Sequence, residues 1–378
     1  MRIYLDHNAT TPVRPEVVDA MTRVLREGFG NPSSVYLEGT NARAEIEEAR
    51  MRVAELLRVK ASDVRWTGGA TESNNTVLFG CLSPGDHVVT TEVEHPSVVA
   101  PLALLEERGV LVTRVRPDVD GCVDADEMVS AINERTKLLT MIWANNEIGS
   151  IQPVEAVAMN CQERGVLMHV DATQAIGKCV VDLEQVPVSF LSSSAHKLGG
   201  PKGAGALISR GEAKLSPFLH GGGQEKGLRG GTENVAGIVG YGVACALAKS
   251  EGAARAEECG KLRERLWQGI VGNLEAVRWN GGPDKTLSNT LNVEFSGVAG
   301  EVLLQALDLE GVAASAGAAC HSGSIEPSGV LLSMGRSAEE ARASLRFSTG
   351  WGVDEAQIDR VIRLLCELVP RVREAHAP

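Results

Sequence analysis

Lys197 and Asp171 are the residues whose types and settings first suggest chemistry. Lys197 stands in Ser192-Ser-Ser-Ala-His-Lys-Leu-Gly-Gly-Pro-Lys-Gly-Ala-Gly, just after an apolar run and before a Gly-Pro turn. Asp171 ends another apolar run 26 positions earlier. A lysine that forms a Schiff base needs its ammonium pKa depressed by burial or by a cationic neighbour. An aspartate at a neighbouring strand end can keep a pyridinium nitrogen protonated, which makes that ring an electron sink.

This pairing is what pyridoxal 5′-phosphate (PLP) requires, but each residue also has a plainer interpretation. Lysine is usually a surface residue, and an aspartate that follows a strand is often a helix N-cap. On spacing alone, the PLP interpretation is therefore the minority one.

A second candidate site is the segment Gly68-Gly-Ala-Thr-Glu-Ser-Asn-Asn, which follows the strand-like run 64–67 and opens a helix near Thr71. Backbone N–H groups and a hydroxyl at a helix start form a ready anion site. A capped helix without a ligand is the simpler interpretation of this segment taken alone. Other phosphate signals are weaker, because residues 172–179 lack the first Gly and the closing Ser or Thr of a P-loop.

Cys320 is the cysteine that deserves separate treatment among the eight in the chain. It lies in Ala314-Ser-Ala-Gly-Ala-Ala-Cys-His-Ser-Gly-Ser, a run of small residues that we expect to be flexible. A thiolate there would be a nucleophile. The other cysteines form no CxxC pair, and in a reducing compartment we expect most to be small buried hydrophobes. With no HExxH motif either, no metal centre is expected.

The elements that must position these residues alternate along the first two thirds of the chain. Apolar runs at 87–91, 111–115, 138–142, 166–170 and 206–209 predict strands, and amphipathic patterns at 15–28, 98–107 and 154–164 predict helices. Strands this apolar, separated by helices, predict an α/β fold with a mostly parallel sheet covered on both faces. Beyond it we expect a long helical region over 233–274, interrupted near Gly252, and strands at 290–295 and 344–348 of a smaller α+β domain.

Composition excludes several classes of protein. The chain has 378 residues, 43% of them hydrophobic, which is enough for a substantial core. Its formal net charge of −12 argues against nucleic acid or an anionic membrane surface as the main partner. No apolar run is long enough for a transmembrane helix, and the first residues lack the features of a signal peptide, so a cytoplasmic location is expected.

Ten short runs resemble those of the cysteine desulfurases, in the same order over nearly the whole chain. They are YLDHNATTP, GNPSS, GATESNN, EHPSVV, NNEIG, HVDATQAIGK, SSAHKLGGPKGAGAL, HGGGQEKGLRGGTENV, SNTLNV and SLRFSTG. That family belongs to the fold-type-I, class V aminotransferase-like PLP enzymes. The resemblance implies a large PLP-binding domain over 13–250, a smaller domain built from 1–12 and 251–378 that carries the Cys320 loop, and a homodimer with shared active sites.

The resemblance also implies roles for residues around the cofactor ring and the substrate. Lys197 would be the internal Schiff-base lysine, Asp171 would pair with the pyridinium nitrogen, and Gln174 would pair with the ring's phenolic oxygen. His95 would lie over the ring face and move protons. Arg346 would bind the substrate carboxylate, for which a guanidinium is the geometric match.

The cofactor phosphate would be held by a further group of residues. These are Ala70, Thr71, Ser194 and His196, joined by Thr232 from the partner subunit. Asn146 would contact the cofactor from the NNEIG turn. The implied reaction converts L-cysteine to L-alanine and transfers sulfur to Cys320 as a persulfide, which then passes to an acceptor protein, as in iron–sulfur cluster biogenesis.

Two alternatives stay open at this point. Cys320 is followed by His321, where iron–sulfur-cluster desulfurases usually carry Thr, and this feature is similar to selenocysteine lyases, which release selenide and L-alanine from L-selenocysteine. A PLP protein that mainly binds a sulfur-transfer partner, with weak turnover, is less well supported, since it has no need of Lys197 or Cys320. An ordinary transaminase would leave Cys320 without a role.

Overall fold

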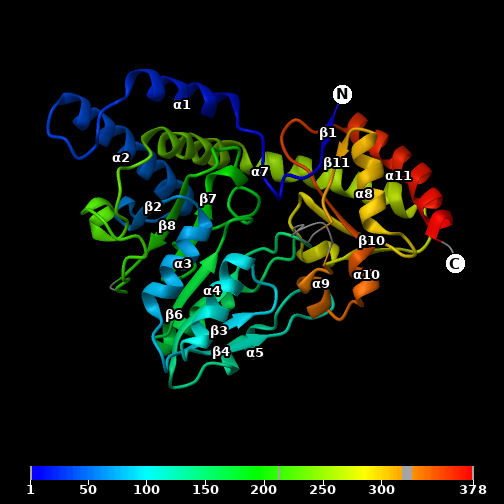
Figure 1. The fold of residues 1–378 in the computed structure, drawn as a ribbon, viewed down its shortest axis with the longest axis horizontal. Helices are drawn as coiled ribbons and strands as arrows, with labels where there is room; N and C mark the ends of the chain where they lie inside the picture. Colours follow the sequence, from blue (N-terminus) through cyan, green and yellow to red (C-terminus); the bar gives the residue numbers. More distant parts are fainter. Residues whose placement is uncertain (1, 212, 317–325, 377–378) are drawn as a thin grey trace.

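The structure is a computed structural model that describes residues 2–211, 213–316 and 326–376. A seven-stranded sheet forms the core of its larger part (Figure 1). The strand order is β2-β8-β7-β6-β5-β3-β4. The five strands from β7 to β4 in that order are mutually parallel, whereas β8 and β2 complete one edge in antiparallel fashion. The strands are β2 (Val64–Thr67), β3 (His87–Thr91), β4 (Leu111–Val115), β5 (Thr136–Ile142), β6 (Leu167–Asp171), β7 (Phe190–Ser194) and β8 (Gly205–Ser209).

Helices cover both faces of this sheet, which confirms the predicted α/β class. On β3 and β5, Val88 and Leu138 pack into a cluster with α3 and α4, while their neighbours Val89 and Leu139 pack into the largest cluster with α2, α6 and α7. Successive strand residues point to opposite faces, so this division marks two helical layers. The helices of this part are α1 (Pro15–Glu27), α2 (Leu37–Leu57), α3 (Ala70–Cys81), α4 (Pro96–Glu107), α5 (Ala125–Ser130), α6 (Val154–Arg164) and α7 (Val235–Val271).

A three-stranded antiparallel sheet, with the order β12-β10-β9, forms the base of a second core. Ile3 and Leu5 belong to this core together with side chains of α8, α11 and the last turns of α7. The N-terminal strand β1 (Ile3–Tyr4) pairs in parallel with β11 (Val312–Ala313). The remaining elements are β9 (Val277–Asn280), β10 (Thr290–Phe295), α8 (Gly300–Leu309), α9 (Gly329–Ser333), α10 (Ala338–Arg342), β12 (Ser344–Ser348) and α11 (Glu355–His376).

Helix α7 is continuous, so the expected interruption near Gly252 was wrong. A glycine inside a helix costs only about 1 kcal/mol relative to alanine. Packing outweighs that cost, because Tyr241 and Cys245 are buried in the first core and Leu262 and Leu266 in the second. The predicted domain boundary at 250/251 falls within this helix, and the division into two domains remains a prediction.

Candidate active site

The ends of neighbouring parallel strands bring Lys197 and Asp171 together. Asp171 is the last residue of β6 and pairs in register with Ser192 of β7. Lys197 ends a short 3₁₀ turn, Ala195–Lys197, that follows β7 directly. Ligands of open α/β sheets bind outside the carboxyl ends of such strands. A cleft of about 930 Å³ opens there, and both side chains line it.

The same cleft brings together most of the residues predicted for the site. Those that line it are Ala70, Thr71, His95, Asn146, Asp171, Gln174, Ser194, His196, Lys197 and Arg346. Thr232 is exposed and is not among the cleft-lining residues of the described chain. Cys320 lies outside the described residues; Ser315, five positions before it, lines the cleft and exchanges two backbone hydrogen bonds with Arg346.

The Lys197 ammonium is held by the N-terminal segment. Its Nζ donates to the carbonyl oxygens of Asn8 at 2.6 Å and Ala9 at 2.7 Å. Burial lowers the pKa of Lys197 to about 8, and the positive charge of Arg346 acts in the same direction, while Asp6 and Asp171 oppose it. A fraction of Lys197 is therefore a neutral amine near pH 7, the form that attacks a carbonyl carbon.

Asp171 is buried and is held by donors on both oxygens. Oδ2 accepts from the Asn74 amide at 2.8 Å, and Oδ1 accepts from the backbone N–H of Thr173 at 3.0 Å. Buried carboxylates persist when such donors satisfy them. Asp171 can therefore present a fixed negative charge to a cationic ring nitrogen in the cleft.

His95 is joined to Asp171 through two further side chains. It is the N-cap of α4, where its Nδ1 accepts from the Ser97 N–H at 3.1 Å and lies 2.7 Å from Ser97 Oγ. Asn74 Nδ2 donates to Ser97 Oγ as well as to Asp171. Because Nδ1 acts as acceptor, the neutral ring carries its proton on Nε2. Burial lowers the pKa of His95, with Asp171 opposing and Lys197 assisting, so the neutral ring is favoured.

The start of α3 forms the other end of the cleft. Gly69 is the N-cap with φ of +152°, and no side chain of the described residues caps the helix there, so the first amides face the cleft uncapped. A Cβ on Gly205 of β8 would lie 2.5 Å from Gly69 Cα, so both glycines are needed for the close approach of turn and strand. Glu72 lies in this turn, but its charge is paired with Arg229 at 3.0 Å. The arrangement suits a phosphate group.

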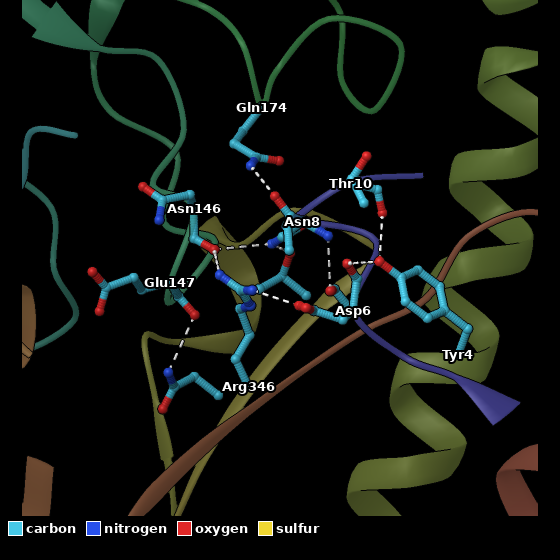
Figure 2. Close-up of polar contacts among 12 residues, drawn as sticks. Tyr4, Asp6, Asn8, Thr10, Asn146, Glu147, Gln174 and Arg346 are labelled. Atoms are coloured by element: carbon cyan, nitrogen blue, oxygen red, sulfur yellow. Dashed lines mark hydrogen bonds and ion pairs between the residues drawn. The ribbon is translucent and has the colours of Figure 1, made fainter. Parts of the chain in front are cut away.

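Arg346 lies in β12 at the opposite wall of the cleft, where Figure 2 shows it beside Asp6 and Asn146. Its side chain is almost entirely buried. Its Nη1 donates to the Asn146 carbonyl oxygen at 2.8 Å, and its Nη2 lies 2.6 Å from Asp6 Oδ1. Nε has no partner among the described residues. A buried guanidinium with unused donors, facing a cleft, can bind a carboxylate.

Sequence reasoning missed several residues that organise the cleft: Asp6, Asn8, Asn74, Ser97 and Lys178. Asn8 accepts from both Lys197 and Gln174 through one carbonyl oxygen, and its own amide donates to the Asn146 carbonyl (Figure 2). Asn8 lies in the run YLDHNATTP, but nothing in the local sequence pattern indicates which distant residues it contacts.

The described cysteines are poor nucleophiles. All seven are free thiols, and burial is the largest cause that raises the pKa of each, to about 11 for Cys122, Cys161 and Cys179 and to about 12 for Cys81. A thiol with a raised pKa supplies little thiolate at neutral pH.

The described residues contain neither a candidate metal centre nor a candidate membrane span. No three or more His, Cys, Asp or Glu side chains gather there in a way that could hold a metal ion. Among the described helices, none combines the length and apolar character needed to cross a membrane.

Comparison with known proteins gives consistent matches over the whole chain. The family model Aminotransferase class-V matches residues 3–361. The cysteine desulfurase IscS of Clostridium botulinum (strain Hall) is 39% identical over 379 residues, covering 99% of this chain and 96% of that protein. The IscS of Methanosarcina thermophila is 41% identical, with 98% and 93% covered.

Solved structures agree with the sequence matches. A NifS-like protein superposes with a TM-score of 0.92 at 35% identity, covering 98% of this chain and all of the other. DndA from Streptomyces lividans superposes with a TM-score of 0.79 at 35% identity, covering 90% of this chain and 97% of the other.

Proposed function

The chain belongs to the class-V aminotransferase family and to its cysteine desulfurases, and from this premise we propose that it takes sulfur from L-cysteine in the cleft described above, leaving L-alanine. The observation that carries the proposal is the convergence on one cleft of Lys197, Asp171, His95 and Arg346. These side chains supply an amine, a fixed anion, a proton carrier and a carboxylate receptor.

The residues of the cleft fit PLP, the cofactor of this family. The uncapped start of α3 suits its phosphate, and the buried Asp171 suits its ring nitrogen. When bound, PLP supplies an electrophilic carbon for an amine and a ring that withdraws electrons from the substrate's α carbon. Lys197 would hold it covalently; the other residues proposed to hold it are Asp171, Gln174, Ala70, Thr71, Asn146, Ser194, His196 and Thr232 of the partner subunit.

Proton movement is assigned to Lys197 and His95. The lowered pKa of Lys197 lets its amine take a proton and return it near neutral pH. His95 carries its exchangeable proton on Nε2, because Ser97 occupies Nδ1. Arg346 orients the substrate by its carboxylate, which fixes the α carbon relative to these two groups.

Sulfur transfer is assigned to Cys320. Its thiolate attacks the substrate sulfur and forms an S–S bond, while the carbon–sulfur bond of the substrate breaks. The bonding pair stays with that carbon, which takes up a proton and becomes the methyl group of L-alanine. Support comes from the other cysteines, whose raised pKa values make them unsuited to this step.

A homodimer and a cytoplasmic location complete the proposal. The stretch between α1 and α2 exposes several apolar side chains, with Phe29 84% and Val35 92% accessible, followed by Tyr36 and Leu37. An exposed apolar patch of this kind suits a protein interface. Pairing of two chains would supply Thr232 of the partner subunit, and the free thiols suit a reducing compartment. The sulfur would pass from Cys320 to an acceptor protein.

The test is to measure L-alanine released from L-cysteine and from L-selenocysteine by purified holoenzyme under reductant. We expect alanine from cysteine, lost in Cys320→Ala and retained in the matched variant Cys366→Ala, whose thiol lies on α11. Alanine formed mainly from selenocysteine, and surviving in Cys320→Ala, would instead identify a selenocysteine lyase. Absence of alanine from both substrates would contradict an enzymatic role.

A further inference from the structure

Asp6 occupies a defined place beside the proposed carboxylate receptor. Figure 2 shows its side chain meeting the Arg346 guanidinium. Its Oδ1 lies 2.6 Å from Arg346 Nη2, and its side chain is only 20% exposed. The contact is built into the backbone, because the extended N-terminal segment pairs with β12. Ser348 N donates to the Leu5 carbonyl at 2.8 Å, and His7 N donates to the Ser348 carbonyl at 3.2 Å. Asp6 thus lies on the segment adjacent to the strand that carries Arg346.

Further hydrogen bonds hold the Asp6 backbone in this position. Its carbonyl oxygen accepts from the Ala9 N–H at 3.0 Å. The single O–H of Tyr4 is shared between this oxygen at 3.1 Å and the Thr10 carbonyl oxygen at 2.9 Å. The N-terminal segment therefore turns tightly after Asp6. Because the backbone of Asp6 is held in place, its short side chain can fix the position of the longer and more flexible Arg346 side chain.

The number of N–H donors on Arg346 decides whether Asp6 would compete with the substrate carboxylate. A guanidinium has five N–H bonds. The Asn146 carbonyl and Asp6 take one each, on Nη1 and Nη2, and Nε has no partner among the described residues. Because Nε is buried, one N–H bond on each of Nη1 and Nη2 remains for a ligand, and a carboxylate bound in bidentate fashion needs two. Arg346 can therefore hold Asp6 and a substrate carboxylate at the same time.

We propose that Asp6 is the positioning residue of the substrate-carboxylate subsite: with the Asn146 carbonyl it holds the Arg346 guanidinium so that the remaining N–H bonds of Nη1 and Nη2 can bind a carboxylate in the cleft. This inference rests on the proposed role of Arg346 in binding the carboxylate of L-cysteine. The N-terminal segment thereby takes part in substrate selection, because Asp6 acts through Arg346.

The experiment compares Asp6→Ala, Asp6→Asn and Asp6→Glu holoenzymes with the parent. Steady-state kinetics with L-cysteine are combined with inhibition by 3-mercaptopropionate, which has the carboxylate and thiol but no amine, and by cysteamine, which has no carboxylate. In Asp6→Ala we expect KM for L-cysteine and the inhibition constant of 3-mercaptopropionate to rise about tenfold. We expect kcat to change less than threefold and cysteamine inhibition to stay the same.

The conservative variants distinguish positioning from charge. Asp6→Asn keeps an acceptor oxygen in place, so we expect it to restore KM to within about threefold of the parent value. Asp6→Glu keeps the charge but is longer by one methylene, so it displaces the guanidinium and should raise KM. Asp308→Ala is the matched control, because Asp308 pairs with Arg2 on the surface.

Two outcomes overturn the inference. One is an Asp6→Ala variant with unchanged KM and unchanged 3-mercaptopropionate inhibition. The other, which decides the matter if Asp6→Ala does not fold, is an Asp6→Glu variant that behaves as the parent. Arg346→Gln separates this from failure of the proposed function: if it also leaves 3-mercaptopropionate inhibition unchanged, Arg346 is not the carboxylate receptor.

Discussion

The ammonium of Lys178 lies 2.5 Å from Gln174 Oε1, and this contact fixes the orientation of the Gln174 amide. A protonated lysine only donates, so the amide oxygen faces it. The amide nitrogen then points to the Asn8 carbonyl, at 2.8 Å, where Lys197 also donates. No carboxylate of the described residues lies within ion-pair distance of Lys178, and burial is the main cause that lowers its pKa to about 7.

Replacing Lys178 by Met should weaken cofactor binding by about tenfold, because Gln174 loses its fixed orientation toward the ring's phenolic oxygen. If Lys178 acts through Gln174, the loss in Lys178→Met/Gln174→Ala should not exceed the larger single loss. PLP affinity measured by equilibrium dialysis gives the comparison, with Lys249→Met on the surface of α7 as control. Additive losses would show that Lys178 acts independently of Gln174.

Ser97→Ala should shift the pH dependence of kcat. The Ser97 hydroxyl stabilises the unprotonated Nδ1 of His95, so its removal favours the imidazolium and raises the pKa of His95. In the parent, burial lowers that pKa, so the acid limb should lie below the ordinary histidine value of 6.5. In Ser97→Ala the limb should move to higher pH and kcat should fall up to about tenfold. An unchanged profile, as expected for Ser250→Ala, would remove Ser97 from the proton path.

Gly205→Ala should reduce the affinity for PLP without unfolding the protein. The added Cβ would lie 2.5 Å from Gly69 Cα and 2.7 Å from the Ser193 carbonyl oxygen, both backbone atoms that move only with their strand or turn. The phosphate end of the cleft must then shift. Gly252→Ala serves as control, since its Cβ would meet nothing closer than 3.6 Å. Retained cofactor absorbance in Gly205→Ala at limiting PLP would contradict the assignment of this turn to the phosphate.

Glu225→Gln should destabilise the fold by about 3 kcal/mol, because it removes the buried anion of Arg50 and leaves only the exposed carboxylate of Glu47 beside that guanidinium. The two side chains form a paired contact at 2.8 and 3.0 Å and are 11% and 4% exposed. Glu225 Oε2 also accepts from the backbone N–H of Trp66, so the pair fixes the segment around residue 225 to β2. Urea unfolding measures the effect, and Glu257→Gln in an exposed pair should leave the midpoint unchanged. A similar midpoint for both variants would refute the prediction.

Much of the fold follows from the sequence pattern because buried strands and helix starts leave local signals. The apolar runs His87–Thr91 and Leu111–Val115 are strands with those bounds, and Pro15 begins α1 as its first residue. The continuity of α7 through Gly252 was not predictable, since it depends on packing against two cores rather than on local propensity.

Some residues of the site can be predicted from local sequence patterns, and others cannot. Lys197 and Asp171 stand out because Asp171 ends one apolar strand and Lys197 comes just after another. Asp6 and Asn8 do not, because their partners Arg346 and Lys197 are distant in sequence and only the tertiary fold brings them together. The roles of all the predicted site residues, Thr232 and Cys320 included, remain predictions.

The pairing of β1 with β11 and of Asp6 with Arg346 also has a consequence for biosynthesis. The ribosome makes Asp6 and Asn8 about 300 residues before their structural partners around Val312 and Arg346. Domains generally form from the N-terminus as the chain emerges. Here the parallel strands around Lys197 can assemble early. The Arg346 carboxylate receptor is made later, and the Asn8 carbonyl that holds Lys197 is fixed in position only when β12 has formed beside it. A nascent chain stalled before residue 312 therefore carries an unfinished cleft and an N-terminal strand without its partner.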